Sequence, residues 1–177
     1  SFPHSPDPPA PRGSAPGPVA EPRGKPPAPM PFDKVLKFGG AALADGPGVQ
    51  RCCQLTTRYG GDRPILVVSA HLGVTDLLDT VARSAADGML EGDRVRIRHR
   101  TLLRQLGLHP ELLDRYFTEL FGLLGGIHER GRLEPSERDL VLSFGERMSA
   151  RIVAQTLRAM GHLATPVDAF DLGLVSD

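Results

Sequence analysis

Hydrophobic and polar positions follow two recurring patterns once the chain passes residue 31. Short apolar runs at 34–38 and 64–68 predict two buried strands. The second run has no polar residue from 65 to 68, which is typical of a parallel strand covered on both faces. Segments 49–59 and 77–85 instead carry apolar or small residues at helical spacing. This order predicts an α/β fold with parallel strands and right-handed crossovers.

Helical spacing dominates the second half of the chain. Residues 91–133 predict helices only, which we interpret as an α-hairpin inserted on the sheet. A helix that begins at Pro135 is expected to end near Phe144, a further helix to cover roughly 146–160, and 162–168 to form a third strand. The whole pattern predicts an open, mostly parallel sheet sandwiched by helices, which the chain leaves incomplete.

The first 31 residues differ in composition from the rest. They hold 12 of the 17 prolines and almost no residue that could enter a core. Such a segment cannot bury enough apolar area to offset its ordering entropy, so 1–31 is predicted to be a disordered or polyproline-like leader. The spacing of Pro26 and Pro29 leaves open an SH3-type ligand, although a simple leader is the favoured interpretation.

Charge gives no reason to expect a nucleic-acid or membrane partner. The formal net charge is zero and the predicted pI is about 7.0, so no long-range attraction to polyanions is expected. No apolar run reaches the length of a membrane span. The densest basic run predicts a solvated helix face in preference to a nucleic-acid patch. Its members are Arg94, Arg96, Arg98, Arg100 and Arg104.

The two cysteines, Cys52 and Cys53, are adjacent in the sequence. Adjacent cysteines make a poor structural disulfide and the chain has no second pair. They are therefore predicted to be reduced residues of a helix, which favours a cytoplasmic location.

The first candidate for chemistry is a lysine beside a glycine turn. Lys37 comes just before Gly39-Gly40 at the end of the first strand. Glycines can adopt backbone angles closed to other residues and let a phosphate approach the amides, while a lysine neutralises its charge. The spacing is not that of a Walker loop, and an ordinary turn is the alternative interpretation.

Two further segments offer polar groups in corresponding places. Ser69 and Thr75 follow the second strand and could hold a carboxylate or phosphate, although Thr75 or Asp76 is first expected to cap the next helix. Glu146 is predicted in the first turn of a helix, where it suits the helix dipole or, in a functional role, an ammonium group or a sugar hydroxyl of a substrate. His71 could serve as a general acid, but an incidental role is favoured.

Four segments together resemble a known family. They are Lys37-Phe38-Gly39-Gly40-Ala41-Ala42, Ser69-Ala70-His71-Leu72-Gly73-Val74-Thr75-Asp76, Leu142-Ser143-Phe144-Gly145-Glu146-Arg147-Met148-Ser149 and Val167-Asp168-Ala169-Phe170-Asp171-Leu172-Gly173-Leu174-Val175-Ser176-Asp177. In order and spacing they are similar to the aspartokinases of the amino acid kinase family. The resemblance covers residues 32–177 and implies the N-terminal portion of a three-layer kinase domain, with 91–133 a helical insertion.

The resemblance also implies an activity and roles for individual residues. The reaction would transfer the γ-phosphoryl group of Mg-ATP to the side-chain carboxylate of L-aspartate, the entry step toward lysine, threonine and methionine. Lys37 would be catalytic and contact the terminal phosphates of ATP, with Gly39 and Gly40 in the same pocket. Ser69 and Thr75 would help bind aspartate, and Glu146 would pair with its amino group. No metal ligand of the protein's own and a possible homodimer are expected.

The chain departs from the family pattern in two places. Ala41 and Ala42 stand where hydroxyl residues usually follow the two glycines. The family's second half, with its Gly-Arg-Gly-Gly-Ser-Asp-type loop, and the regulatory ACT domains have no counterpart in residues 32–177, so the chain alone is expected to be inactive. Two alternatives remain open: a non-catalytic homologue that binds aspartate or pairs with a complete kinase, and a family member acting on another carboxylate or on carbamate. Phe144-Gly145-Glu146 argues against the latter.

Overall fold

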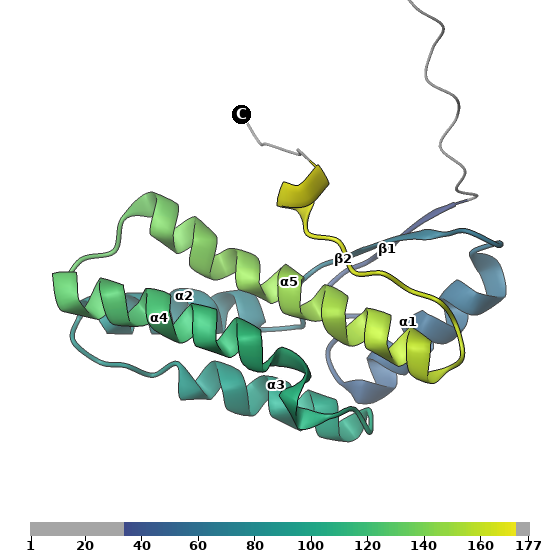
Figure 1. The fold of residues 1–177 in the computed structure, drawn as a ribbon, viewed down its shortest axis with the longest axis horizontal. Helices are drawn as coiled ribbons and strands as arrows, with labels where there is room; N and C mark the ends of the chain where they lie inside the picture. Colours follow the sequence, from purple (N-terminus) through teal and green to yellow (C-terminus); the bar gives the residue numbers. More distant parts are fainter. Residues whose placement is uncertain (1–33, 173–177) are drawn as a thin grey trace, which may run out of the picture. The chain divides into compact units, whose positions relative to one another are not determined.

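The computed structural model describes residues 34–172, which form two strands, five α-helices and two short 3-10 helices (Figure 1). The proline-rich leader predicted at 1–31 and the last residues, 173–177, lie outside the described residues. Within them, helices follow strands in the predicted alternation and the strands are parallel, so the predicted α/β class is confirmed.

The sheet consists of β1 (Val35–Phe38) and β2 (Ile65–Val68), with Lys37 opposite Val67. Side chains alternate between its two faces, and Phe38, Leu66 and Val68 pack against the core. On the other face Val35 is 59% exposed and Val67 is 45% exposed. The expectation that β2 is covered on both faces is therefore wrong for the described residues, because helices pack on one face only.

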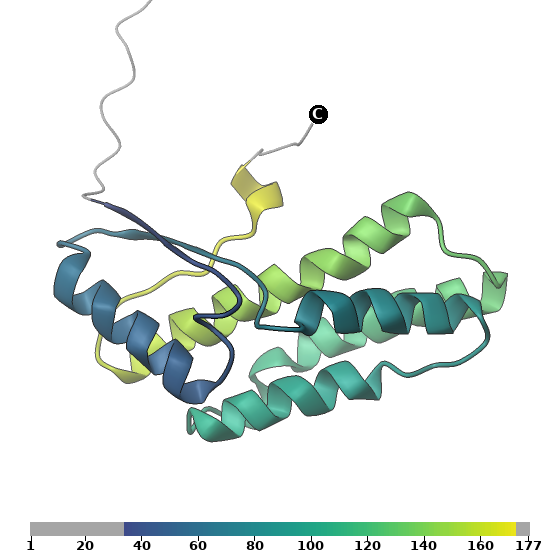
Figure 2. The same cartoon turned by 180° about the vertical axis from the view of Figure 1, so that it is seen from behind.

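Two helices cover the inner face of the sheet. Helix α1 (Gly46–Tyr59) and helix α5 (Pro135–Ala159) lie on the same side of the strands in opposite views (Figures 1 and 2). Asp45 caps α1, since its Oδ1 accepts a hydrogen bond of 2.8 Å from the amide of Gly48. Helix α2 (Val74–Ala86) follows β2 and packs against α5.

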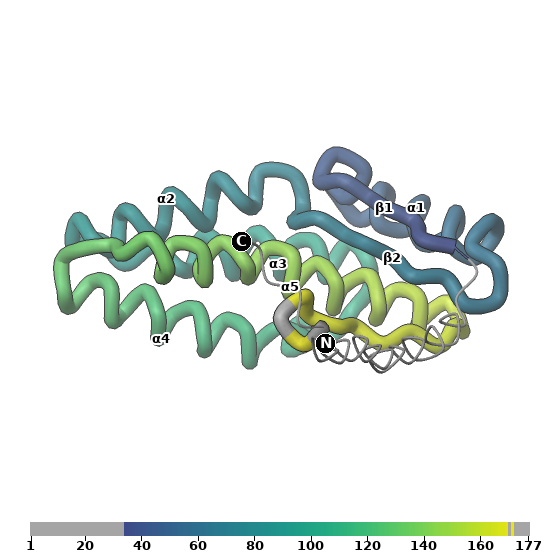
Figure 3. The backbone as a smooth tube through the Cα atoms, turned by 90° about the horizontal axis from the view of Figure 1, so that it is seen from above, coloured from purple at the N-terminus to yellow at the C-terminus, as the bar shows by residue number. Residues whose placement is uncertain are grey.

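The predicted helical segment 91–133 contains α3 (Asp93–Gln105), a 3-10 turn η1 (Pro110–Leu113) and α4 (Asp114–Arg130). These helices were expected on the sheet, but α4 packs mainly against α2 and α5, and α3 mainly against α1 and α2 (Figure 3). Their apolar stripes are thus buried by other helices. Whether this segment is an insertion in the family fold stays a prediction.

Helix α5 runs unbroken through Phe144–Glu146. The predictions that one helix ends near Phe144 and another begins at residue 146 are therefore wrong. A capping box of Glu134 and Glu137, with Pro135 in the first turn, fixes the start of α5. In an exposed helix, a glycine at a position like that of Gly145 would lower stability by about 1 kcal/mol relative to alanine. Here it is buried in a helix contact, so packing stabilises the continuous helix and Glu146 lies near the middle of α5.

The predicted third strand at 162–168 is not formed in the described part of the chain; these residues have no regular structure before a 3-10 turn, η2 (Ala169–Leu172). Side chains of α5 hold the segment instead of a neighbouring strand. Arg158 donates a 2.8 Å hydrogen bond to the carbonyl of Ala164, and Arg151 binds Asp168. Pro166 also lacks the amide that a strand ladder requires.

Both cysteines are free and buried on α1, which agrees with the predicted helix residues. Burial raises the pKa of the Cys53 thiol to about 12, so this thiol is protonated at neutral pH. Within residues 34–172, no helix combines the length and the apolar character needed to cross a bilayer.

Candidate active site

The carboxyl ends of the two parallel strands meet at one edge of the sheet. The amide of Ser69, just after β2, donates a 3.1 Å hydrogen bond to the carbonyl of Phe38 at the end of β1. The Gly39–Gly40 turn and the Ser69–Thr75 segment therefore leave the sheet side by side. In open α/β sheets this edge is where ligands bind.

Gly40 is required by the close approach of these two segments. A Cβ atom at Gly40 would lie 2.8 Å from the carbonyl oxygen of Ala70, closer than real Cβ contacts allow. At Gly39 a Cβ would meet no atom within 4 Å, so that position is open. Neither glycine has a positive φ, which corrects the expectation that they supply unusual backbone angles. The turn requires glycine at position 40 because there is no room for a Cβ atom there.

Gly145 brings the third segment to the same place. A Cβ atom at Gly145 would lie 2.7 Å from the Cβ of Ala70, and Val74 and Leu78 complete the contact. Helix α5 thus touches the segment after β2 through a bare glycine. Glu146 follows directly and is exposed beside this contact.

The structure brings together, at Ala70, three segments that carry predicted site residues. Gly40 and Gly145 approach Ala70 itself, and Gly39, Ser69 and Glu146 are their sequence neighbours. Lys37 lies next to the end of β1 with its side chain exposed. In residues 34–172, the side chains of Lys37, Ser69, Thr75 and Glu146 make no hydrogen bond or ion pair.

Two predicted helix-start roles are wrong. Helix α2 begins at Val74 with Gly73 as its N-cap, at a φ of 75°, and no side chain caps it. Thr75 and Asp76 therefore lie in the first turn and do not act as caps. Glu146 is far from the N-terminus of α5 and gains nothing from the positive end of that helix. These corrections remove the structural explanations proposed for Thr75 and Glu146.

His71 has a structural role that sequence reasoning missed. Its ring is buried and its Nδ1 lies 2.8 Å from the carbonyl oxygen of Leu43, in the segment that follows Gly40. A carbonyl can only accept, so Nδ1 carries the proton. Burial lowers the pKa of His71 to about 4, which keeps the ring neutral at pH 7. The alternative of a general acid finds no support in this geometry.

The basic run on α3 also divides into two kinds of residue. Arg94 pairs with Glu91, Arg96 with Asp93 and Arg100 with Asp114, as a solvated face would. Arg98 turns inward and donates to the backbone carbonyl of Ala44 at 2.8 Å. No pattern in the sequence distinguishes Arg98, because it shares the spacing of its neighbours.

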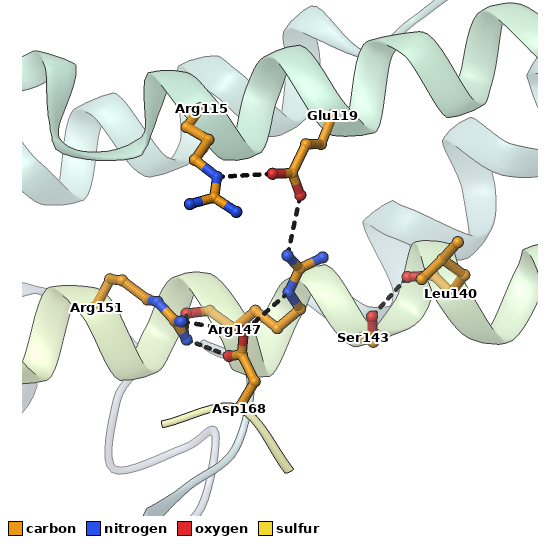
Figure 4. A network of polar contacts seen from close by, with 7 residues as sticks. All are labelled: Arg115, Glu119, Leu140, Ser143, Arg147, Arg151 and Asp168. Carbon is orange, nitrogen blue, oxygen red and sulfur yellow. Dashed lines mark hydrogen bonds and ion pairs between the residues drawn. The ribbon is translucent and has the colours of Figure 1, made fainter. Parts of the chain in front are cut away.

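A network of charges on α5 begins at Arg147, directly after Glu146, and includes Arg151 about one turn further on. Figure 4 shows Arg147 between Glu119 of α4, at 3.0 Å, and Asp168, at 3.5 Å, while Arg151 binds the same Asp168 through two nitrogens. The aromatic rings of Tyr116 and Phe144 pack against Arg147. Hydrogen bonds from Arg115 and Arg147 hold the pKa of Glu119 below its ordinary value. This network holds the side chains of Arg147 and Arg151 in place on α5, next to Glu146.

The donor set of the site suits a phosphate and an amino acid better than a metal ion. The described residues contain no group of three or more histidine, cysteine, aspartate or glutamate side chains that could hold a metal. Lysine and open glycine amides suit phosphate oxygens, hydroxyls suit a carboxylate, and a glutamate suits an ammonium group.

Comparison with known proteins gives a consistent result. Residues 34–176 match the family model of the amino acid kinase family. Aspartokinase 2, chloroplastic, of Arabidopsis thaliana is 28% identical over 149 residues, covering 80% of this chain and 27% of that protein. Aspartokinase 3 of Bacillus subtilis is 30% identical over 154 residues, covering 80% of this chain and 32% of that protein.

A solved structure shows the same arrangement of elements. The crystal structure of E. coli aspartokinase III in complex with aspartate and ADP matches with a TM-score of 0.60 and 25% identity, over 72% of this chain and 29% of that one. The chain therefore spans about a third or less of the length of these relatives.

Proposed function

The chain belongs to the amino acid kinase family, and from this premise we propose that it forms the aspartate side of an aspartate kinase site. The reaction is transfer of the γ-phosphoryl group of Mg-ATP to the side-chain carboxylate of L-aspartate, which gives 4-phospho-L-aspartate. The relatives named above are aspartokinases, and the E. coli one was crystallised with aspartate and ADP. The observation that carries the proposal is the convergence of three segments on Ala70.

Each free side chain at this edge of the sheet has a task in such a reaction. Glu146 pairs with the α-ammonium group of aspartate, and the hydroxyls of Ser69 and Thr75 donate to its carboxylates. Lys37 offsets the charge on the phosphoryl group during transfer. A carboxylate nucleophile needs no general base, so positioning and charge neutralisation dominate catalysis. The absence of a histidine base in this arrangement agrees with that chemistry, since His71 is buried and neutral.

The residues present also fit the terminal phosphates of ATP. The space beside Gly39 lets backbone amides approach an oxyanion, and Lys37 has no partner among the described residues that would compete. When bound, Mg-ATP supplies the phosphoryl group, and phosphate oxygens are ordinary Mg²⁺ ligands. A role in lysine, threonine and methionine synthesis, a homodimer and a cytoplasmic location remain predictions.

The first test measures binding and turnover by the chain itself. Calorimetry with L-aspartate reports binding, and hydroxylamine trapping of the acyl phosphate with Mg-ATP reports transfer. We expect Glu146→Gln to weaken aspartate binding about 10-fold or more, because a charged hydrogen bond contributes about 1.5–3 kcal/mol. Lys37→Ala should leave aspartate binding nearly unchanged and lower any turnover by orders of magnitude.

Matched controls lie on the same elements or on an exposed surface. Lys34, just before β1, donates to the carbonyl of Tyr59, so Lys34→Ala should leave turnover unchanged. Glu129 on α4 is exposed, and Glu129→Gln should bind aspartate normally. Aspartate binding that does not respond to Glu146→Gln would contradict the assignment. Binding without transfer is the result expected both of this part of a kinase domain and of the non-catalytic homologue.

A further inference from the structure

Helix α3 reaches both segments that form the proposed site, although none of its residues was a site candidate. Nη2 of Arg98 donates to the carbonyl of Ala44 at 2.8 Å and to that of Leu72 at 3.4 Å. Ala44 ends the turn that begins with Gly39, and Leu72 lies in the segment between β2 and α2. A single nitrogen therefore joins the two loops that leave the strands.

Two other contacts reinforce the connection. His71, in the second loop, donates from Nδ1 to the carbonyl of Leu43 in the first. Gln105, at the last turn of α3, accepts a 2.9 Å hydrogen bond from the amide of Gly46. Gln105 thus holds only the start of α1, directly after the first loop, whereas Arg98 holds both loops.

We propose that Arg98 is a positioning residue that sets the spacing between the phosphate turn at Gly39–Gly40 and the aspartate segment at Ser69–Thr75. The inference deepens the proposed function and depends on it for the identity of the ligand. A guanidinium group suits this task because its donors are fixed in one plane, so both carbonyls are held in one geometry. Lysine would present a flexible point charge and could not impose that geometry.

The test uses the 177-residue chain with Arg98→Ala and Arg98→Lys, and measures amide hydrogen exchange without ligand. The reporters are the amide of Leu43, bonded to the carbonyl of Gly40, and that of Val74, bonded to the carbonyl of His71. We expect both to exchange about 10-fold faster or more in Arg98→Ala, with Arg98→Lys intermediate. Amides in the interior of α5 should be unchanged, which separates loop loosening from global unfolding.

Two variants on the same helix serve as controls. Arg104→Ala removes the same charge as Arg98→Ala, but the side chain of Arg104 binds only Thr101 of its own helix. Amide exchange in Arg104→Ala should therefore match that of the original chain. Gln105→Ala should speed exchange at Leu43 and leave Val74 unchanged. Unchanged exchange in both loops of Arg98→Ala would overturn the inference.

The second readout is calorimetric binding of L-aspartate, which separates this inference from the proposed function. Arg98→Ala should weaken it about 10-fold, and Arg104→Ala should not. Loosened loops with unchanged aspartate affinity would overturn the positioning role while leaving the proposed function intact. If the original chain does not bind aspartate, the proposed function fails. Hydrogen exchange then decides alone whether Arg98 fixes the two loops.

Discussion

Gly145 shows how much of the site depends on one missing side chain. A Cβ atom at residue 145 would lie only 2.7 Å from the Cβ of Ala70, which is too close for two carbon atoms. Glycine is unfavourable in a helix interior, so its presence here reflects contact between α5 and the loop after β2. This contact places Glu146 next to the segment Ser69–Thr75.

Adding a methyl group at this position should therefore destabilise the chain. We expect Gly145→Ala to lower the free energy of unfolding by about 1–3 kcal/mol, since overpacking outweighs the roughly 1 kcal/mol gain in helix propensity. Urea denaturation measures the change. In the double variant Gly145→Ala with Ala70→Gly, most of the loss should be recovered, because the two positions are in contact.

Gly122 on α4 provides the matched control, since a Cβ there would meet no atom within 4 Å. Gly122→Ala should stabilise the chain by up to about 1 kcal/mol. Equal stabilisation by Gly145→Ala would show that α5 does not press against Ala70.

At the scale of elements, ion pairs with arginines of a helix can hold a chain segment in place where no neighbouring strand pairs with it. Residues 162–168 were expected to form a strand, and their apolar pattern does not reveal that Asp168 binds Arg147 and Arg151. Sequence patterns predict local periodicity, whereas the choice of partner depends on where α5 passes. The unbroken α5 was missed for the same reason, since the packing that stabilises Gly145 comes from Ala70, 75 positions earlier in the sequence.

Removing the charge of Asp168 should release this segment from α5. The side chains of Asp168 and its two arginines are only 14–16% exposed, so the pair is weakly screened. We expect Asp168→Asn to lower the free energy of unfolding by about 2–3 kcal/mol, measured by urea denaturation, because Arg151 loses the carboxylate that it binds and Arg147 keeps only Glu119. Limited proteolysis should cut near residues 162–168 faster.

The exposed pair of Arg115 and Glu119 gives the comparison. Arg115 is 81% exposed, and Arg115→Ala should change stability by no more than about 0.5 kcal/mol. A similarly small effect of Asp168→Asn would mean that the segment is fixed by something other than this network.

At the scale of the whole molecule, two buried histidines link stability to pH. His71 and His99 have ring centroids 6.1 Å apart, and burial lowers the pKa of each to about 4. Nε2 of each ring is buried without a hydrogen-bond partner among the described residues. The unfolded chain binds protons on these rings near pH 6.5 and the folded chain does not, so acidification favours unfolding.

Stability should therefore fall as the pH drops from 6.5 toward 4. Between pH 7 and pH 5 we expect a loss of about 2 kcal/mol for each histidine, measured by urea denaturation at both values. His99→Phe, which keeps a ring against Phe117, should remove about half of this pH dependence. The exposed His162 is the control, and an equal effect of His162→Phe would contradict the role of burial.

The sequence predicted the general architecture well and the site's construction poorly. Strand and helix periodicity located β1 and β2 to within one residue and α1 and α2 to within three, because local patterns specify these elements. Candidate residues such as Gly40 and Glu146 were found as motifs. Their convergence on Ala70, the burial of His71 and the inward turn of Arg98 arise only from tertiary packing, which no local pattern encodes.

The position of Lys37 on the exposed face of the small sheet also affects the solubility of the chain. Val35, Ile65 and Val67 are all at least 39% exposed on this face, and Lys37 is the charged residue among them. A charged side chain among exposed apolar ones keeps them from forming a continuous apolar patch, which would favour association. Lys37→Ala leaves an uninterrupted apolar surface on short strands, which favours self-association at high protein concentration. A polar replacement such as Lys37→Gln would remove the ammonium group from the proposed phosphate site while preserving the colloidal stability of the chain.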